Sequence, residues 1–213
     1  MKIKHPVLSN LLRRIVMAVM MIALSVSLAW AGQPTDQLKE TLNQMITTLN
    51  NPTLKAKNKV QEKRNALHNI LKCRFDQEAL AERALGNHWN KITPEEKQAF
   101  IKVFIPLLEK TYFDKIDAQL ATTGDISGEN IHYINEMVKG DYAQVETKIL
   151  AGEAAPIPVI YRLKNNQGNW YVVDMAIEGV IITKNYRAQF DEILARDSLA
   201  TLIKTLQDKL ASP

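Results

Sequence analysis

The chain has 213 residues, with 27 Lys and Arg against 23 Asp and Glu. Residues 1–31 hold four of the basic residues and no acidic one, so 23 of each sign remain beyond that segment. An electrically balanced remainder has no general attraction to polyanions, and nucleic-acid binding is therefore excluded as the expected function. The remaining length of roughly 180 residues suits one domain with a sizeable core.

The N-terminal segment predicts export. Four basic residues precede an uncharged, mostly apolar run at 15–28, and the small residues of "AWA" (29–31) follow it. This order is typical of a secretory signal peptide. The run is shorter than the about 20 residues of a membrane-spanning helix. Because no cysteine follows it directly, lipid attachment is not expected. We therefore expect a signal peptide at 1–31, cleaved after Ala31, and a single exported domain at 32–213. An uncleaved anchor is the alternative.

Apolar residues at helical spacing predict helices in the first half of the exported part. One helix follows Asp36, a candidate N-cap, and a second covers about 53–71. "TPEE" (93–96) combines the residues of a capping box with Pro at the first helical position. The long apolar stripe after it contains Pro106, which predicts a kinked helix. The second helix also carries a basic run, either a solvated face or a docking surface for acidic partners or anionic head groups: Lys55, Lys57, Lys59, Lys63 and Arg64.

The region 130–177 predicts four antiparallel strands, because alternating stretches are joined by short turns such as "KGDY" and "NNQG". In the last strand one apolar face is expected from Tyr171, Val173, Met175 and Ile177. Two helices, marked by apolar residues at 186–194 and 199–210, close the chain. The pattern is that of a single α+β domain, a four-stranded antiparallel twisted sheet with helices packed around it.

Residues for catalysis are scarce. The sequence contains no G-x-S-x-G elbow, no His or Cys pair at metal-ligand spacing and no glycine-rich phosphate loop, so we expect no metal and no cofactor. Asp174 and Glu178 could serve a cavity enzyme. More simply, they accept hydrogen bonds from the backbone or from Arg187 and fix the corner between strand and helix. His88 is interpreted as a hydrogen-bonded neighbour of a core Trp, and Cys73 as a small buried hydrophobe, with a reactive thiol as the alternative.

Five segments in this order carry a family resemblance: "FDQEALAERALGNHW" (75–89), "TPEEKQAF" (93–100), "FIPLLEKTY" (104–112), "GNWYVVDMAIEGV" (168–180) and "NYRAQF" (185–190). Together they resemble the MlaC family, also called the toluene-tolerance family, over about residues 36–210. The patterns A-L-G-x-H-W, W-x-x-x-D-x-x-x-E-G and N-Y-R-x-Q-F are specific in this order and spacing. One departure is that Ile181 and Ile182 follow Val180, where a serine is expected after the valine.

The resemblance implies a periplasmic phospholipid carrier that helps to maintain outer-membrane lipid asymmetry. Such proteins shuttle phospholipid between an outer-membrane lipoprotein complex and an inner-membrane ABC transporter complex with a substrate-binding ring. The implied fold encloses a deep apolar pocket for acyl chains, and a monomer without catalytic residues is expected. Two alternatives stay open on the residues alone, namely a cavity enzyme acting on an apolar substrate and a periplasmic adaptor that binds no ligand.

The candidate lipid-binding residues combine this resemblance with the converging apolar faces of the predicted elements. They are Phe104, Leu108, Tyr112, Val145, Ile149, Val159, Tyr161, Val173, Met175, Ile177, Val180, Tyr186 and Phe190. Arg187 is a candidate for the head-group phosphate, with a structural salt bridge as the alternative. Periodicity alone does not separate pocket lining from ordinary core.

Overall fold

The computed structural model describes residues 33–150, 152 and 155–212, which belong to one compact unit. The predicted signal peptide and its cleavage after Ala31 lie outside the described residues. Among the described helices, none is long and apolar enough to cross a membrane. The helices and strands, in chain order, are α2 (Pro34–Asn50), α3 (Val60–Arg74), α4 (Gln77–Leu85), α5 (Pro94–Thr123), β1 (Ile131–Lys139), β2 (Tyr142–Ile149), β3 (Ile157–Asn166), β4 (Asn169–Ile177), β5 (Val180–Ile181), α6 (Ile182–Leu194) and α7 (Leu199–Ala211).

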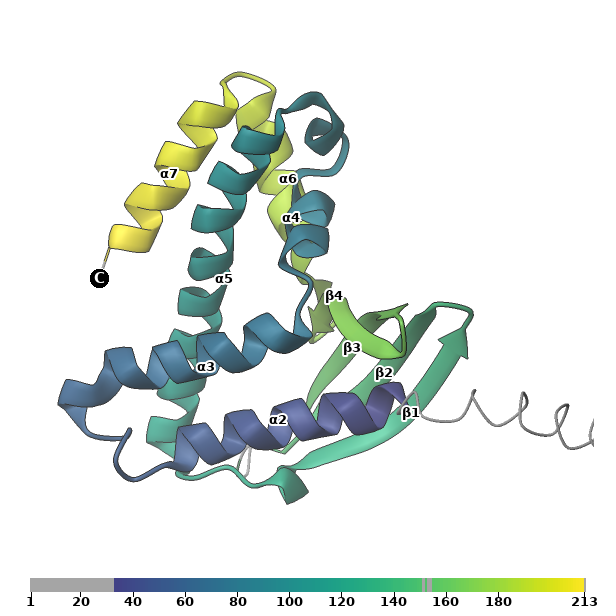
Figure 1. Cartoon of the computed structure of the whole chain (residues 1–213). Coiled ribbons are helices and arrows are strands. Elements are labelled where there is room, and N and C mark those ends of the chain that lie inside the picture. The colour runs from purple at the N-terminus through teal and green to yellow at the C-terminus, as the bar shows by residue number, and fades with distance from the viewer. Residues whose placement is uncertain (1–32, 151, 153–154, 213) are drawn as a thin grey trace, which may run out of the picture. The chain divides into compact units, whose positions relative to one another are not determined.

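The described elements confirm an α+β fold with an antiparallel sheet, in the order β1-β2-β3-β4-β5 (Figure 1). The predicted number of four strands is wrong, because the chain turns back after β4 and adds β5. Glu178 and Gly179 form this turn with φ of 51° and 81°, as a tight hairpin turn requires at both central residues. A strand of two residues has no alternating pattern from which it could be predicted.

A register shift between β3 and β4 corrects the predicted face of β4. Leu163 pairs with Val172 and Arg162 pairs with Asp174, so Val173 is the extra residue of a β-bulge. Beyond the bulge, Met175 pairs with Tyr161. The face of β4 that packs on the same side as Tyr161 is therefore formed by Trp170 and Val172 before the bulge and by the half-buried Met175 and Ile177 after it. The expected face is right for Met175 and Ile177 and wrong for Tyr171 and Val173.

Helix α2 packs on one face of the sheet (Figure 1). Its buried Leu38 and Leu42 share a cluster with Val145 and Tyr161, which register opposite each other on β2 and β3. The helix begins at Pro34, so the prediction of Asp36 as N-cap is wrong. Proline favours the first helical position because its missing N–H would have no partner there anyway.

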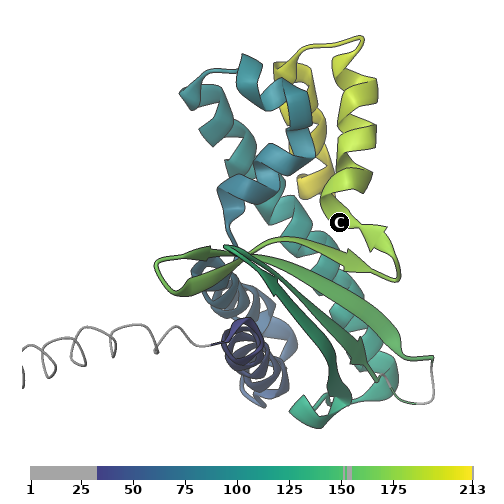
Figure 2. The same cartoon turned by 90° about the vertical axis from the view of Figure 1, so that its right-hand side faces the viewer.

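Helices α4, α6 and α7 and the first part of α5 gather at one end of the unit, whereas α2 and α3 lie with the sheet and α5 continues past them (Figures 1 and 2). The capping box that starts α5 is confirmed, since the Thr93 side chain accepts from the Glu96 N–H and the Glu96 carboxylate accepts from the Thr93 N–H. Pro106 lies within the helix, which has 30 residues. At about 1.5 Å per residue α5 is long enough to pass both groups of elements.

Two expectations on the segment before α5 are wrong. The second helix covers Val60–Arg74 instead of about 53–71, and Cys73, expected to be buried, is exposed. A separate helix, α4, follows it and was not expected from the apolar spacing. Asp76 caps α4 by accepting a hydrogen bond from the Ala79 N–H at 2.9 Å.

Candidate functional site

The buried apolar residues form three clusters, whereas most domains of this size have one contiguous core. The helical cluster consists of Leu80, Ala81, Ala84, Leu85, Trp89, Phe100, Val103, Phe104, Ile105, Leu107, Leu108, Ile182, Phe190, Leu202 and Leu206. The sheet cluster consists of Leu38, Leu42, Ile131, Ala143, Val145, Val159, Tyr161, Leu163, Trp170 and Val172. The junction cluster, between α2, α3 and α5, consists of Leu49, Leu67 and Phe113.

Four half-buried apolar side chains lie where these clusters meet, and we call them the seam. Phe75, Met175 and Ile177 pack against both the helical and the sheet cluster, and Met45 packs against both the sheet and the junction cluster. Large apolar side chains that converge between elements without being fully covered leave apolar surface to be buried. Two of the four, Met175 and Ile177, are among the predicted lipid-binding residues.

Five of the predicted residues belong to the helical cluster or pack against it. Phe104 and Phe190 are buried, and their rings contact each other at 5.5 Å between centroids. Phe104 also contacts the ring of Tyr186, at 5.2 Å between centroids. Leu108 lies in the same cluster, and Tyr112 packs against it while only half-buried. Fixed ring contacts give this cluster the character of packed core.

The predicted residues on the sheet also divide into fully buried and half-buried side chains. Val145, Val159 and Tyr161 are at most 3% exposed, and all three belong to the sheet cluster. Ile149, at the end of β2, is half-buried and packs on the same cluster. The seam residues Met175 and Ile177 pair with Tyr161 and Val159, respectively. They therefore extend this apolar face toward the helical cluster.

Two predicted positions lie apart from the converging side chains. Val173, at the bulge of β4, is buried but belongs to none of the three clusters. Val180 is 55% exposed on the short strand β5. Their assignment to the lipid site stays a prediction, as it does for the other eleven residues.

Arg187 makes a structural contact with the end of α4. Its Nε donates to the carbonyl oxygen of Arg83 at 2.8 Å, and its Nη2 donates to the same oxygen. A Cβ atom at Gly86, where φ is 54°, would lie 2.8 Å from the Arg187 Nε. The positive φ and the close guanidinium both favour glycine at position 86. A role of Arg187 toward a head group stays a prediction.

Asp174 accepts a backbone hydrogen bond at the corner between strand and helix, as the simpler interpretation expects, whereas Arg187 bonds to Arg83 and to neither carboxylate among the described contacts. The Asp174 carboxylate is 2% exposed and accepts hydrogen bonds from the Met175 N–H and the Thr183 hydroxyl, both at 2.9 Å. Glu178 contributes its backbone N–H, which donates to the Pro158 carbonyl. His88 Nε2 lies 3.0 Å from an Asp191 carboxylate oxygen beside the buried Trp89. These polar groups serve the fold.

Tyrosines at the edges of the clusters are held neutral by their surroundings. Burial raises the pKa of Tyr112 to about 12, with the nearby Tyr186 adding to the shift. Burial likewise raises the pKa of Tyr133 to about 12. Because burial disfavours the phenolate, these side chains present apolar rings and an uncharged hydroxyl.

Two cavities of the described surface contain none of the thirteen predicted side chains. One, of about 540 Å³, is lined by Lys72, Phe75, Asp76, Gln77, Lys164, Asn165, Asn166 and Tyr171. The other, of about 510 Å³, is lined by Glu40, Asn43, Gln44, Thr47, Thr48 and Ile70. Polar residue types predominate in both linings, and the deep apolar pocket stays a prediction. Among the described residues, no three His, Cys, Asp or Glu side chains form a metal-binding group.

The fold is shared with a solved structure of a phospholipid-binding protein from Ralstonia solanacearum, determined in complex with a phospholipid. The TM-score is 0.72 at 22% identity, and the match covers 84% of this chain and 98% of the other. At this identity the similarity establishes the fold.

A curated relative from Haemophilus influenzae, named intermembrane phospholipid transport system binding protein MlaC, is 27% identical over 136 residues. The matched part is 62% of this chain and spans 60% of the relative's length. The sequence model of the MlaC protein family matches residues 39–208, which include every described helix and strand at least in part. The chain therefore belongs to the MlaC family.

Proposed function

We propose that this chain is a phospholipid carrier that shuttles lipid between the two membranes of a Gram-negative cell. The observation that carries the proposal is the seam, where apolar side chains from α2, β4 and the α3–α4 connection converge without being fully buried. Family membership supports it, since the related protein of Haemophilus influenzae is named for intermembrane phospholipid transport and the Ralstonia solanacearum structure holds a phospholipid.

The lipid site must satisfy a thermodynamic condition. Burying each acyl methylene is worth about 0.8 kcal/mol, so two chains of roughly fifteen carbons represent about 24 kcal/mol of avoided water exposure. A carrier that extracts lipid from a bilayer must nearly match this value with its own apolar surface. Half-buried side chains such as Met45, Met175 and Ile177 supply such surface between packed clusters.

We place the acyl chains at the seam, between the sheet cluster and the helical cluster. A pocket opens there when the two clusters separate, and the long flexible side chains of Met45 and Met175 adapt to a ligand of variable shape. The neutral tyrosine Tyr112, half-buried beside the helical cluster, adds an apolar ring to the same region. In this arrangement the chain acts as a binding protein and performs no reaction on the lipid.

The cellular setting follows from the predicted signal peptide and from the family. The carrier acts in the periplasm as a monomer. It exchanges lipid with an outer-membrane lipoprotein complex and with an inner-membrane ABC transporter complex, and so contributes to outer-membrane asymmetry. No cofactor takes part, since the lipid is cargo.

Native mass spectrometry of protein exported to the periplasm and purified without detergent tests the proposal. We expect a chain that begins at Gly32, carries no acyl group and binds an additional mass equal to intact phospholipid. A catalytic role predicts turnover of the lipid or another apolar substrate, and an adaptor predicts no bound lipid. Ligand-free protein that also fails to take up phospholipid from vesicles would contradict the carrier.

A further inference from the structure

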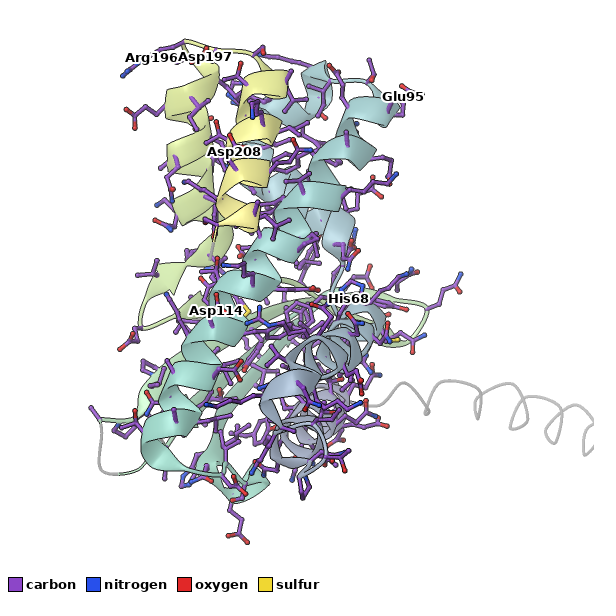
Figure 3. All side chains as sticks on the ribbon, turned by 90° about the vertical axis from the view of Figure 1, so that its left-hand side faces the viewer. His68, Glu95, Asp114, Arg196, Asp197 and Asp208 are labelled. Carbon is purple, nitrogen blue, oxygen red and sulfur yellow. The ribbon has the colours of Figure 1, made fainter. Side chains whose placement is uncertain are left out.

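A row of ion pairs joins the segment containing α3 to the segment containing α5. Lys63 Nζ lies 2.6 Å from an Asp117 carboxylate oxygen, and Arg64 pairs with Asp114. His68 Nδ1 lies 2.9 Å from both oxygens of Glu109. In Figure 3, the labelled His68 and Asp114 lie on α3 and α5.

The signs of these charges are segregated. Lys55, just before α3, pairs with Asp125, just after α5, so each of these pairs has its base on the 55–68 segment and its acid on the 109–125 segment. Within each segment both signs occur, as in the Lys59–Glu62 and Lys110–Asp114 pairs, so the segregation is confined to the pairs that join the two segments. The basic run of the sequence is therefore largely used within the molecule.

The apolar contact beneath the ion pairs is small. Leu67 is the buried residue of α3, and it meets Leu49 and Phe113 in the junction cluster. Leu71 and Ile116 pack on this cluster while only half-buried. The N-terminal part of α3 is consequently held to α5 by partly buried ion pairs and by one buried leucine.

The C-terminal end of α3, in contrast, is anchored. Arg74 donates to the carbonyl of Trp170 at 2.8 Å and to the Gln37 side chain at 2.7 Å. Just beyond it, Phe75 forms a β-bridge with Val172. Helix α3 also packs along α2. The contact that can open while the C-terminal end of α3 stays fixed is therefore the one with α5, where ion pairs bridge little apolar surface.

We propose that α3 is a gate for acyl chains and that its ion pairs with α5 are the latch. This inference rests on the proposed lipid binding and adds the route of entry. Opening of the latch moves Leu67 and Leu71 away from α5 and exposes the junction cluster beside Met45 of the seam. Closing it covers the bound chains, and the latch sets the rate of lipid exchange.

The test measures transfer of fluorescently labelled phosphatidylethanolamine from loaded protein to vesicles of phosphatidylethanolamine and phosphatidylglycerol. The double variant Lys63→Asp and Arg64→Asp places like charges across the latch, and we expect transfer about tenfold faster, the equivalent of two lost pairs. Adding Asp114→Lys and Asp117→Lys exchanges the signs, and should return the rate to within about twofold of the unaltered protein.

A matched control breaks an ion pair elsewhere. Lys204 Nζ lies 3.1 Å from the Asp208 carboxylate on α7, and both side chains are largely exposed (Figure 3 labels Asp208). The variant Asp208→Lys should leave the transfer rate unchanged. High salt should accelerate transfer by the unaltered protein and have less effect on the double variant, whose latch is already broken.

A second measurement does not depend on weakening the fold. In a Cys73→Ser background, Arg64→Cys and Asp114→Cys are joined by a cleavable thiol-reactive linker, which should stop transfer until the linker is cut. Unaltered transfer rates in both the double variant and the linked protein would overturn the gate while leaving the carrier intact. Absence of lipid from the unaltered protein would overturn both.

Discussion

The hydroxyl of Thr183 donates a hydrogen bond of 2.9 Å to the carboxylate of Asp174, and both side chains are buried. This contact ties the centre of β4 to the first turn of α6. Arg162 lies above the same carboxylate, with 3.6 Å between Nη1 and Oδ2. The direction of α6, and with it the position of Phe190 in the helical cluster, depends on this buried carboxylate.

Removing the Thr183 hydroxyl should therefore destabilise the fold. The variant Thr183→Val leaves one buried carboxylate oxygen without its donor, and we expect a loss of about 1–3 kcal/mol in the free energy of unfolding. Urea denaturation measures it. Thr205→Val is the matched control, because the hydroxyl of the half-buried Thr205 donates to the Thr201 carbonyl one turn earlier and has no carboxylate partner there. Equal midpoints for the two variants would contradict the structural role of Asp174.

Filling the seam should displace lipid. Met175→Trp adds volume on the face of β4 that meets both clusters, and we expect lipid occupancy to fall severalfold with little loss of stability, since Met175 is only half-buried. Ile160→Trp is the control. Ile160 registers opposite Ala176, one residue away along the sheet and on its other face. Native mass spectrometry gives both occupancies, and equal occupancy would place the chains elsewhere.

Alkaline pH should destabilise the protein through its half-buried tyrosines. In the folded state the pKa values of Tyr112 and Tyr133, about 12, lie above the usual tyrosine value of 10.0. The folded state thus holds these protons more tightly, and the associated stability is complete below pH 10 and is lost as pH rises toward 12. Denaturation across this window should show a decline that the double variant Tyr112→Phe and Tyr133→Phe reduces. The exposed Tyr142→Phe should not reduce it.

Bound lipid should raise thermal stability. A ligand that binds only the folded state adds about 4 kcal/mol at a thousandfold excess over Kd. For a domain of roughly 180 residues this corresponds to a rise of several degrees in Tm. Protein stripped of lipid should melt lower than loaded protein, and added phospholipid should restore the difference. Identical melting temperatures would indicate that the clusters are complete without a ligand.

The predictable parts of the fold are those with local signals. The start of α5 was predicted because Thr93 and Glu96 form a reciprocal cap within four residues. The first four strands were predicted because alternation and short turns specify them together. The family could be identified because five sequence segments, among them A-L-G-x-H-W and N-Y-R-x-Q-F, occur in one order and spacing.

The parts that were missed depend on how strands and clusters pair, which no periodic sequence pattern specifies. The bulge at Val173 moves the buried face of β4 by one residue, and the two-residue β5 exists only through its pairing with β4. Cys73 follows two apolar residues, yet it lies on the exposed side of α3. Periodicity identified apolar faces correctly in general, but whether a face meets packed core or the seam depends on how three clusters meet.

The division of the core bears on how the molecule opens in solution. Phe100, Phe104 and Phe190 contact one another, whereas Val145 and Tyr161 belong to the sheet cluster, so the two groups can lose their order in separate steps. Backbone amides of the helices that form the helical cluster and amides of the central strands would then exchange with solvent deuterium as two groups, each with its own free energy of opening. An acyl chain that lies across Met175 and Ile177 would contact both clusters. The two groups of amides would then open together as one cooperative unit, with the bound lipid as part of the apolar core.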